Sequence, residues 1–146
     1  MRRPAAIDVL LEDVRRDMDR VQPADLASEL AAGALLVDTR PSDQRSRDGD
    51  LPGAVVIDRN VLEWRLDPTC SHHIPEVSHA GVRIIVVCNE GYSSSLAAAT
   101  LRQLGLSYAT DLVGGFQAWK RLFRDTDHSH LEQQRRPGSR QVDISK

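Results

Sequence analysis

The chain has 146 residues, of which 40% are hydrophobic and 27% are charged, and its formal net charge is −2. This length suits a single domain with a proper core, and the composition is ordinary for a soluble globular protein. The small net charge, without a basic patch interleaved with aromatic residues, argues against nucleic-acid binding, and no apolar run is long enough to span a membrane.

The cysteine content indicates the redox environment. The N-terminus lacks the apolar core of a secretory signal, and the chain contains only Cys70 and Cys88. Two cysteines without such a signal are typical of reduced thiols, so we expect a cytoplasmic protein and not a disulfide framework.

The N-terminal residues predict a helix and then a strand–helix pair. Apolar residues at helical spacing over residues 7–18 predict an amphipathic helix that packs on the domain or, less commonly, meets a partner. Arg20–Val21 predicts a short strand. Pro23 suits the first turn of the next helix and Gly33 its C-cap. The amphipathic stripe comprises Ile7, Leu10, Leu11, Val14 and Met18.

The central part of the chain continues this alternation. Ala34–Asp38 and Ala54–Ile57 are short apolar runs that predict strands, with a short polar helix at 41–48 between them. Another helix is predicted to begin at Asn60. The segment 67–80 is rich in Pro, Ser and His and predicts an irregular surface loop.

The last strands and helices define the fold class. Ile84–Val87 is an unbroken β-branched run, typical of a strand buried on both faces, and Tyr108–Leu112 predicts one further strand. Strands alternating with helices indicate an α/β fold with a parallel sheet covered on both faces. We expect an N-terminal helical extension at 1–20, one domain at 21–125, and a polar, mobile tail at 126–146.

Cys88 occupies a chemically distinctive position. It follows the strand Ile84–Val87, and a polar segment with Gly91 leads to Ser93, where a strong helix former begins. Backbone N–H groups in such a loop converge on an anion, and a helix N-terminus behind them favours the nucleophilic thiolate. The alternative is that Cys88 is a small buried hydrophobe.

Four separated stretches resemble motifs of the rhodanese (sulfurtransferase) family. Their order and spacing agree over about residues 21–123, and the N-terminal helix and the tail lie outside the resemblance. In chain order they are Asp38-Thr39-Arg40, similar to the family's Asp-x-Arg; Gly49 to Ala54, similar to Gly-His-Ile-Pro-Gly-Ala; Cys88 to Ser94, similar to Cys-x-x-Gly-x-Ser/Arg-Ser; and Gly114 to Trp119, similar to Gly-Gly-x-x-Ala-Trp.

The resemblance implies a three-layer α/β/α domain with a five-stranded parallel sheet. It also implies ping-pong sulfur transfer, in which Cys88 takes a sulfane sulfur from thiosulfate or a persulfide and passes it to a thiol, a protein or another acceptor. No bound cofactor and no metal are implied. The persulfide would lie among Asn89, Glu90, Gly91, Tyr92, Ser93 and Ser94, and Asp38 and Arg40 would support this loop from beneath.

Departures from the family pattern concern the sulfur donor. Asn89 and Ser93 stand where thiosulfate-preferring members often carry Arg or Lys, and Asp50 replaces a frequent His. Glu90 adds a negative charge that repels a dianionic donor, so we expect a persulfide or a protein to be the better donor. Neighbouring arginines could restore positive potential, namely Arg40, Arg45, Arg47, Arg59 and Arg65.

Other readings of these residues are weaker. Phosphatases of related folds use Cys-x5-Arg, but the sixth residue after Cys88 is Ser94, which cannot clamp an oxyanion. The spacing of Cys70 with His72, His73 and His79 matches no common zinc site, so we interpret that segment as a solvated loop. A disulfide that resolves Cys88 through Cys70 is a minor hypothesis. Trp64 and Trp119 are assigned to packing.

Two functions therefore remain open. The intact cysteine favours a sulfurtransferase that turns over through a Cys88 persulfide. The loop without Arg and the extra N-terminal helix favour a binding or sulfur-relay module that docks a partner protein and has little turnover of its own.

Overall fold

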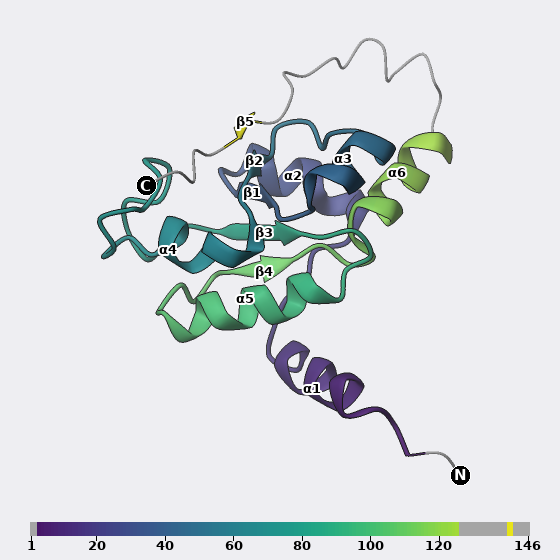
Figure 1. The fold of residues 1–146 in the computed structure, drawn as a ribbon, viewed down its shortest axis with the longest axis horizontal. Coiled ribbons are helices and arrows are strands. Elements are labelled where there is room, and N and C mark those ends of the chain that lie inside the picture. Colours follow the sequence, from purple (N-terminus) through teal and green to yellow (C-terminus); the bar gives the residue numbers. More distant parts are fainter. Residues whose placement is uncertain (1–2, 126–139, 142–146) are drawn as a thin grey trace.

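The computed structural model describes residues 3–125 and 140–141, which form a three-layer α/β/α domain (Figure 1). The predicted α/β fold with a parallel sheet is confirmed. The strands are β1 (Leu35–Asp38), β2 (Val55–Val56), β3 (Ile84–Val87), β4 (Thr110–Asp111) and β5 (Arg140–Gln141). The helices are α1 (Ala6–Arg15), η1 (Pro23–Asp25), α2 (Leu26–Ala31), α3 (Ser42–Asp48), η2 (Arg59–Val61), α4 (Leu62–Leu66), α5 (Ser93–Gln103) and α6 (Gly115–Asp125).

The sheet has the order β4-β3-β1-β2-β5, and all of its strand pairs are parallel. Successive side chains of a strand point to opposite faces, so β3 divides its residues between two cores. Ile84 and Val86 pack with residues of α4 and α5, whereas Ile85 and Val87 pack with α2 and α6. The unbroken β-branched run is thus explained by burial on both faces.

The strand predicted at Arg20–Val21 is absent from the sheet, and a strand that was not predicted, β5, is present at its other edge. Val21 makes only an isolated parallel bridge to Leu112, so Arg20–Val21 is not a strand of the sheet. The outer strand β5 instead comes from the polar tail, where Arg140 and Gln141 pair with Val55 and Val56. The predicted mobility of the remaining tail, 126–139 and 142–146, falls outside the described residues.

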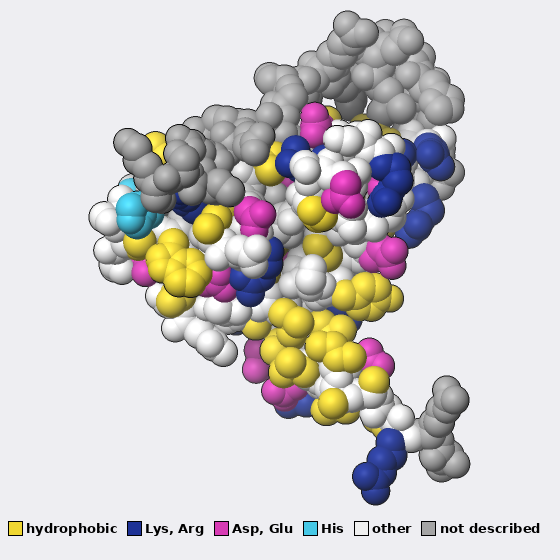
Figure 2. All heavy atoms as spheres, in the orientation of Figure 1, with side chains coloured by type: hydrophobic (Ala, Val, Ile, Leu, Met, Phe, Trp, Pro, Cys, Tyr) yellow, Lys and Arg dark blue, Asp and Glu magenta, His cyan; other side chains and the backbone are white. Residues whose placement is uncertain are grey.

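The N-terminal helix α1 lies against α5, as its apolar stripe predicts, but only part of that stripe is buried. Leu11 and Met18 are buried. Ile7 and Leu10 are about half exposed, and Figure 2 shows hydrophobic side chains gathered on this outer face of α1. No helix of the described residues combines the length and the apolarity needed to cross a membrane.

The segment 67–80 is irregular, as predicted, but it also contributes to the core. Ile74 and Val77 are buried in it, against the side of the sheet that α4 and α5 cover. The assignment of Trp64 to packing is wrong, because its side chain is 58% exposed. Trp119 does pack, with its ring centroid 5.4 Å from that of Phe116.

Candidate active site

Cys88 follows β3 directly, and its sulfur faces the loop that leads into α5. The sulfur accepts hydrogen bonds from the backbone N–H of Gly91 at 3.1 Å and of Ser94 at 3.4 Å. It also lies 3.2 Å from Ser94 Oγ. Cys88 is buried, with only 6% of the residue exposed.

These hydrogen bonds decide the ionisation of the thiol. Burial, the largest effect, raises the pKa of Cys88, but hydrogen bonds from the Ser94 and Ser93 side chains and from the N–H groups of Ser94 and Gly91 outweigh it. The net pKa therefore lies below the ordinary cysteine value. The thiolate, which is the nucleophilic form, is thus populated at lower pH than in an unperturbed cysteine.

Ser94→Ala is expected to raise the pKa of Cys88, because it removes a side-chain hydrogen bond that stabilises the thiolate. The measurement is the rate of iodoacetamide alkylation as a function of pH, made in a Cys70→Ser background so that only Cys88 reacts. The wild-type midpoint should lie below the roughly 8.5 of a free thiol, and that of the variant should be higher. Ser28→Ala is the matched control, because the Ser28 hydroxyl donates to the carbonyl of Asp25, three residues earlier, in an exposed helical turn. An unchanged midpoint in Ser94→Ala would contradict this role.

Two glycines allow the loop to close against the start of α6. Gly91 has a φ of +87° and Gly115 a φ of +62°, values that side-chain-bearing residues rarely adopt. A Cβ on Gly115 would lie 2.5 Å from the carbonyl oxygen of Cys88. The same close approach lets Phe116 N–H donate to that oxygen at 2.9 Å. The Gly-Gly motif thus packs the backbone of α6 directly on the cysteine loop.

Asp38 and Arg40 form an ion pair at the end of β1, next to β3. Both side chains are fully buried, with Arg40 Nη2 donating to Asp38 Oδ2 at 2.8 Å. Arg40 also donates to the carbonyl of Gly49 at 2.9 Å, and its guanidinium lies 3.7 Å from the ring centroid of Phe116. This pair joins β1 and the turn before β2 to the first residues of α6.

A cleft of about 640 Å³ opens beside the loop, and its charges are balanced. Arg47 and Arg121 contribute positive charge, whereas Asp48 and Glu90 contribute negative charge. Arg47 is already paired with Asp48 at 3.0 Å. The remaining lining residues are Asn89, Tyr92, Gly114 and Gln117.

Of the five arginines considered from the sequence, Arg47 alone lines this cleft. The other four are held elsewhere: Arg40 pairs with Asp38, Arg45 donates to the carbonyl of Arg40, Arg59 pairs with Glu63, and Arg65 donates to the carbonyl of His72.

Several residues around the loop were not found from the sequence. Arg121 follows the Gly-Gly motif by two helical turns, so a cationic position in α6 was a usable signal. Arg15, Arg20 and Asp111 gave no such signal, because they reach the loop from distant parts of the chain.

The loop that carries Cys70 and the histidines lies away from Cys88. It leads into the start of β3, whereas Cys88 follows the end of that strand (Figure 1). Both cysteines are free. Within residues 3–125 and 140–141, no three His, Cys, Asp or Glu side chains are grouped so that they could hold a metal ion.

A model of the rhodanese-like domain family matches residues 22–122, which span this sheet and the cysteine loop. The chain belongs to the rhodanese family. The thiosulfate sulfurtransferase GlpE of Stutzerimonas stutzeri is 31% identical over 118 residues, covering 81% of this chain and 98% of that protein. The adenylyltransferase and sulfurtransferase MOCS3 of Oryza sativa is 31% identical over 119 residues, which cover 77% of this chain and 26% of that protein.

Solved structures agree with the rhodanese assignment. The human single-domain sulfurtransferase TSTD1 superimposes with a TM-score of 0.59 at 27% identity, covering 70% of this chain and 95% of that one. A protein of unknown function from Rhodopseudomonas palustris, described as a possible tyrosine phosphatase, superimposes with a TM-score of 0.71 at 27% identity, covering 84% of this chain and 96% of that one. In this rhodanese the cysteine loop of residues 88–94 contains no arginine to clamp a phosphate.

Proposed function

We propose that the protein is a sulfurtransferase that carries sulfane sulfur on Cys88. The observation that supports this most directly is the pair of backbone donors on the Cys88 sulfur, the N–H groups of Gly91 and Ser94, with the Ser94 hydroxyl 3.2 Å from the same sulfur. These groups stabilise a thiolate, and they also suit the anionic persulfide that replaces it.

The reaction has two displacement steps. The Cys88 thiolate attacks the outer sulfur of the donor, a new S–S bond forms, and the donor leaves as sulfite or as a thiolate. An acceptor thiolate then attacks the outer sulfur of the persulfide, which regenerates the Cys88 thiolate. Each step moves one neutral sulfur atom between two nucleophiles, so no external oxidant or reductant is needed.

The charges of the cleft favour a persulfide over thiosulfate as donor. The carboxylates of Asp48 and Glu90 offset the guanidinium groups of Arg47 and Arg121, so a dianion gains little on entry. The sulfur atoms of a persulfide carry at most one negative charge in total, whereas thiosulfate carries two.

A second candidate is a sulfur-relay module that docks a protein partner. Two observations favour it: the residue Cys88 is buried, and the rice relative, of which this chain spans 26%, joins a sulfurtransferase to an adenylyltransferase. In that case sulfur reaches and leaves Cys88 only when the partner is bound.

Intact-mass measurement after incubation with thiosulfate, mercaptopyruvate or a low-molecular-weight persulfide tests the proposal. Wild type is expected to gain about 32 Da, the mass of one sulfur atom, as a covalent intermediate requires. Cys70→Ser should keep the adduct and Cys88→Ala should lose it. An adduct that persists in Cys88→Ala would place the nucleophile elsewhere, and no adduct with any donor would favour the relay module.

A further inference from the structure

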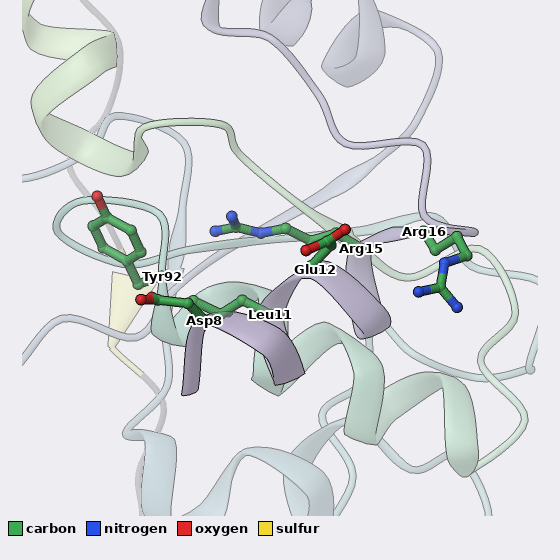
Figure 3. A pocket seen from close by; sticks show the side chains of 6 residues that line it. All are labelled: Asp8, Leu11, Glu12, Arg15, Arg16 and Tyr92. Atoms are coloured by element: carbon green, nitrogen blue, oxygen red, sulfur yellow. The ribbon is translucent and has the colours of Figure 1, made fainter. Parts of the chain in front are cut away.

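The segment before the rhodanese module reaches the cysteine loop. Arg15 Nη2 donates to the carbonyl oxygen of Gly91 at 2.7 Å, and Arg20 Nη2 donates to the same oxygen at 3.0 Å. Figure 3 shows the Arg15 side chain extending from α1 towards Tyr92 in this loop, with its guanidinium carbon 5.9 Å from the ring centroid. Both arginines precede residues 22–122, which the family model matches.

The Gly91 carbonyl is therefore held by two cations on one side of the loop. The following peptide bond is trans, so the N–H of Tyr92 points away from the arginines. Gly91 N–H, one peptide earlier, donates to the Cys88 sulfur. Fixing this carbonyl fixes the plane of the peptide that joins Gly91 to Tyr92, next to the amide that bonds the sulfur.

Arg20 also reaches the sulfur through a chain of hydrogen bonds. It donates to Asp111 at 2.8 Å and 3.1 Å, and the side chain of this aspartate is fully buried. Asp111 Oδ2 accepts from the hydroxyl groups of Ser94 at 2.7 Å and Ser95 at 2.8 Å. Ser94 Oγ in turn lies 3.2 Å from the Cys88 sulfur.

The Ser94 hydroxyl has one hydrogen, and either Asp111 Oδ2 or the Cys88 sulfur can accept it. While it donates to Asp111, its lone pairs face the sulfur and accept the thiol hydrogen. When the thiol ionises, this hydrogen can turn to the sulfur, because Asp111 keeps its bonds from Arg20 and Ser95. Without Arg20, Asp111 would lose its direct ion-pair partner. Its carboxylate lies within about 6 Å of the sulfur, as two hydrogen bonds in series require, and would then hold the hydrogen and repel the thiolate.

We propose that Arg20 is a positioning residue of the cysteine loop. It holds the Gly91 carbonyl together with Arg15, and it pairs directly with Asp111, which Arg15 reaches through Ser95, so that the Ser94 hydroxyl is free to donate to the Cys88 sulfur. The inference rests on the proposed chemistry of Cys88 and names the group that prepares it. Other charged groups on the elements around the loop stay unchanged in these variants, namely Asp8 and Glu12 of α1, Asp38, Arg40, Arg47, Asp48, Glu90 and Arg121.

The test compares Arg20→Gln, Asp111→Asn and the double variant in a Cys70→Ser background. Iodoacetamide alkylation of Cys88 is measured from pH 5 to pH 10. Arg20→Gln is expected to react about tenfold more slowly at neutral pH, with its profile moved to higher pH, because an unpaired carboxylate disfavours the thiolate. Adding Asp111→Asn removes that charge and should restore the rate to within about threefold of the single Asp111→Asn variant.

The controls separate positioning from a merely structural role. Arg16→Gln, at a neighbouring exposed residue whose guanidinium pairs with Asp13, should leave the profile unchanged. Arg20→Lys keeps the charge beside Asp111, and its profile should stay closer to wild type than that of Arg20→Gln. Loss of structure alone predicts that the double variant reacts no faster than Arg20→Gln, and that result would overturn the proposal. A wild-type profile in Arg20→Gln would overturn it as well.

If Arg20→Gln does not fold, Arg20→Lys and Asp111→Asn decide the matter. The proposal is overturned if the alkylation profile of either variant is moved to higher pH than that of wild type.

Alkylation needs no sulfur donor, so this experiment is independent of the proposed function. A wild-type protein that never gains sulfur would refute the sulfurtransferase while leaving the alkylation profiles to decide the role of Arg20. Conversely, if wild type gains sulfur and the Arg20 variants keep the wild-type alkylation profile, only the proposed role of Arg20 is refuted.

Discussion

Gly115→Ala is expected to slow sulfur loading of Cys88 by at least about 100-fold, the effect of displacing a backbone donor from a catalytic anion site. The new Cβ would lie 2.5 Å from the carbonyl oxygen of Cys88 and 2.7 Å from the nitrogen of Gly91. These atoms belong to backbone, so the loop itself has to move, and the Gly91 N–H leaves the sulfur. Loading is followed by intact mass over time with the best donor found for wild type.

The same substitution should also lower the free energy of unfolding. Overpacking costs about 1–3 kcal/mol and a side chain in the left-handed region about 1–2 kcal/mol more. Gly105→Ala is the matched control, because its φ is +96° but a Cβ there meets nothing within 4 Å. It should show the backbone strain and load sulfur at the wild-type rate. Wild-type loading by Gly115→Ala would show that the close approach of α6 does not shape the loop.

The features that the sequence predicted well are those set by local patterns. The run Ile84–Val87 required a strand buried on both faces, and the serines followed by Leu96 and alanines required a helix after it. These patterns thereby predicted Cys88 at the end of a buried strand, and it does follow β3. The resemblance predicted Asp38 and Arg40 beneath the loop. The structure shows both side chains fully buried at the end of β1, the strand that pairs with β3.

The features that were missed depend on distant contacts or on backbone alone. Arg15 and Arg20 meet Gly91 across 76 and 71 residues of chain, and an arginine on an amphipathic helix looks like a solvated residue until its partner is known. β5 pairs through the backbone of Arg140 and Gln141, whose polar side chains carry no strand signal. Trp64 was misassigned because size alone does not bury a residue.

Arg40→Met is expected to be the most destabilising of the charge substitutions considered. It leaves Asp38 fully buried without its partner, and breaking a buried ion pair in this way costs about 3–5 kcal/mol. The contact of the guanidinium with Phe116 and the bond to the Gly49 carbonyl are lost as well. For a domain of this size the melting temperature should fall by roughly 10 °C, measured by circular dichroism.

Neutralising the partner separates charge burial from packing. Asp38→Asn with Arg40→Met removes both charges and keeps a side-chain oxygen that can accept the backbone N–H of residue 40, which Asp38 accepts at 3.0 Å. We expect the double variant to melt above Arg40→Met, because no uncompensated charge remains in the core. Arg16→Met, in an exposed pair with Asp13, should melt close to wild type. A double variant that melts below Arg40→Met would mean that the pair acts through its packing and hydrogen bonds, since restoring neutrality would then recover nothing.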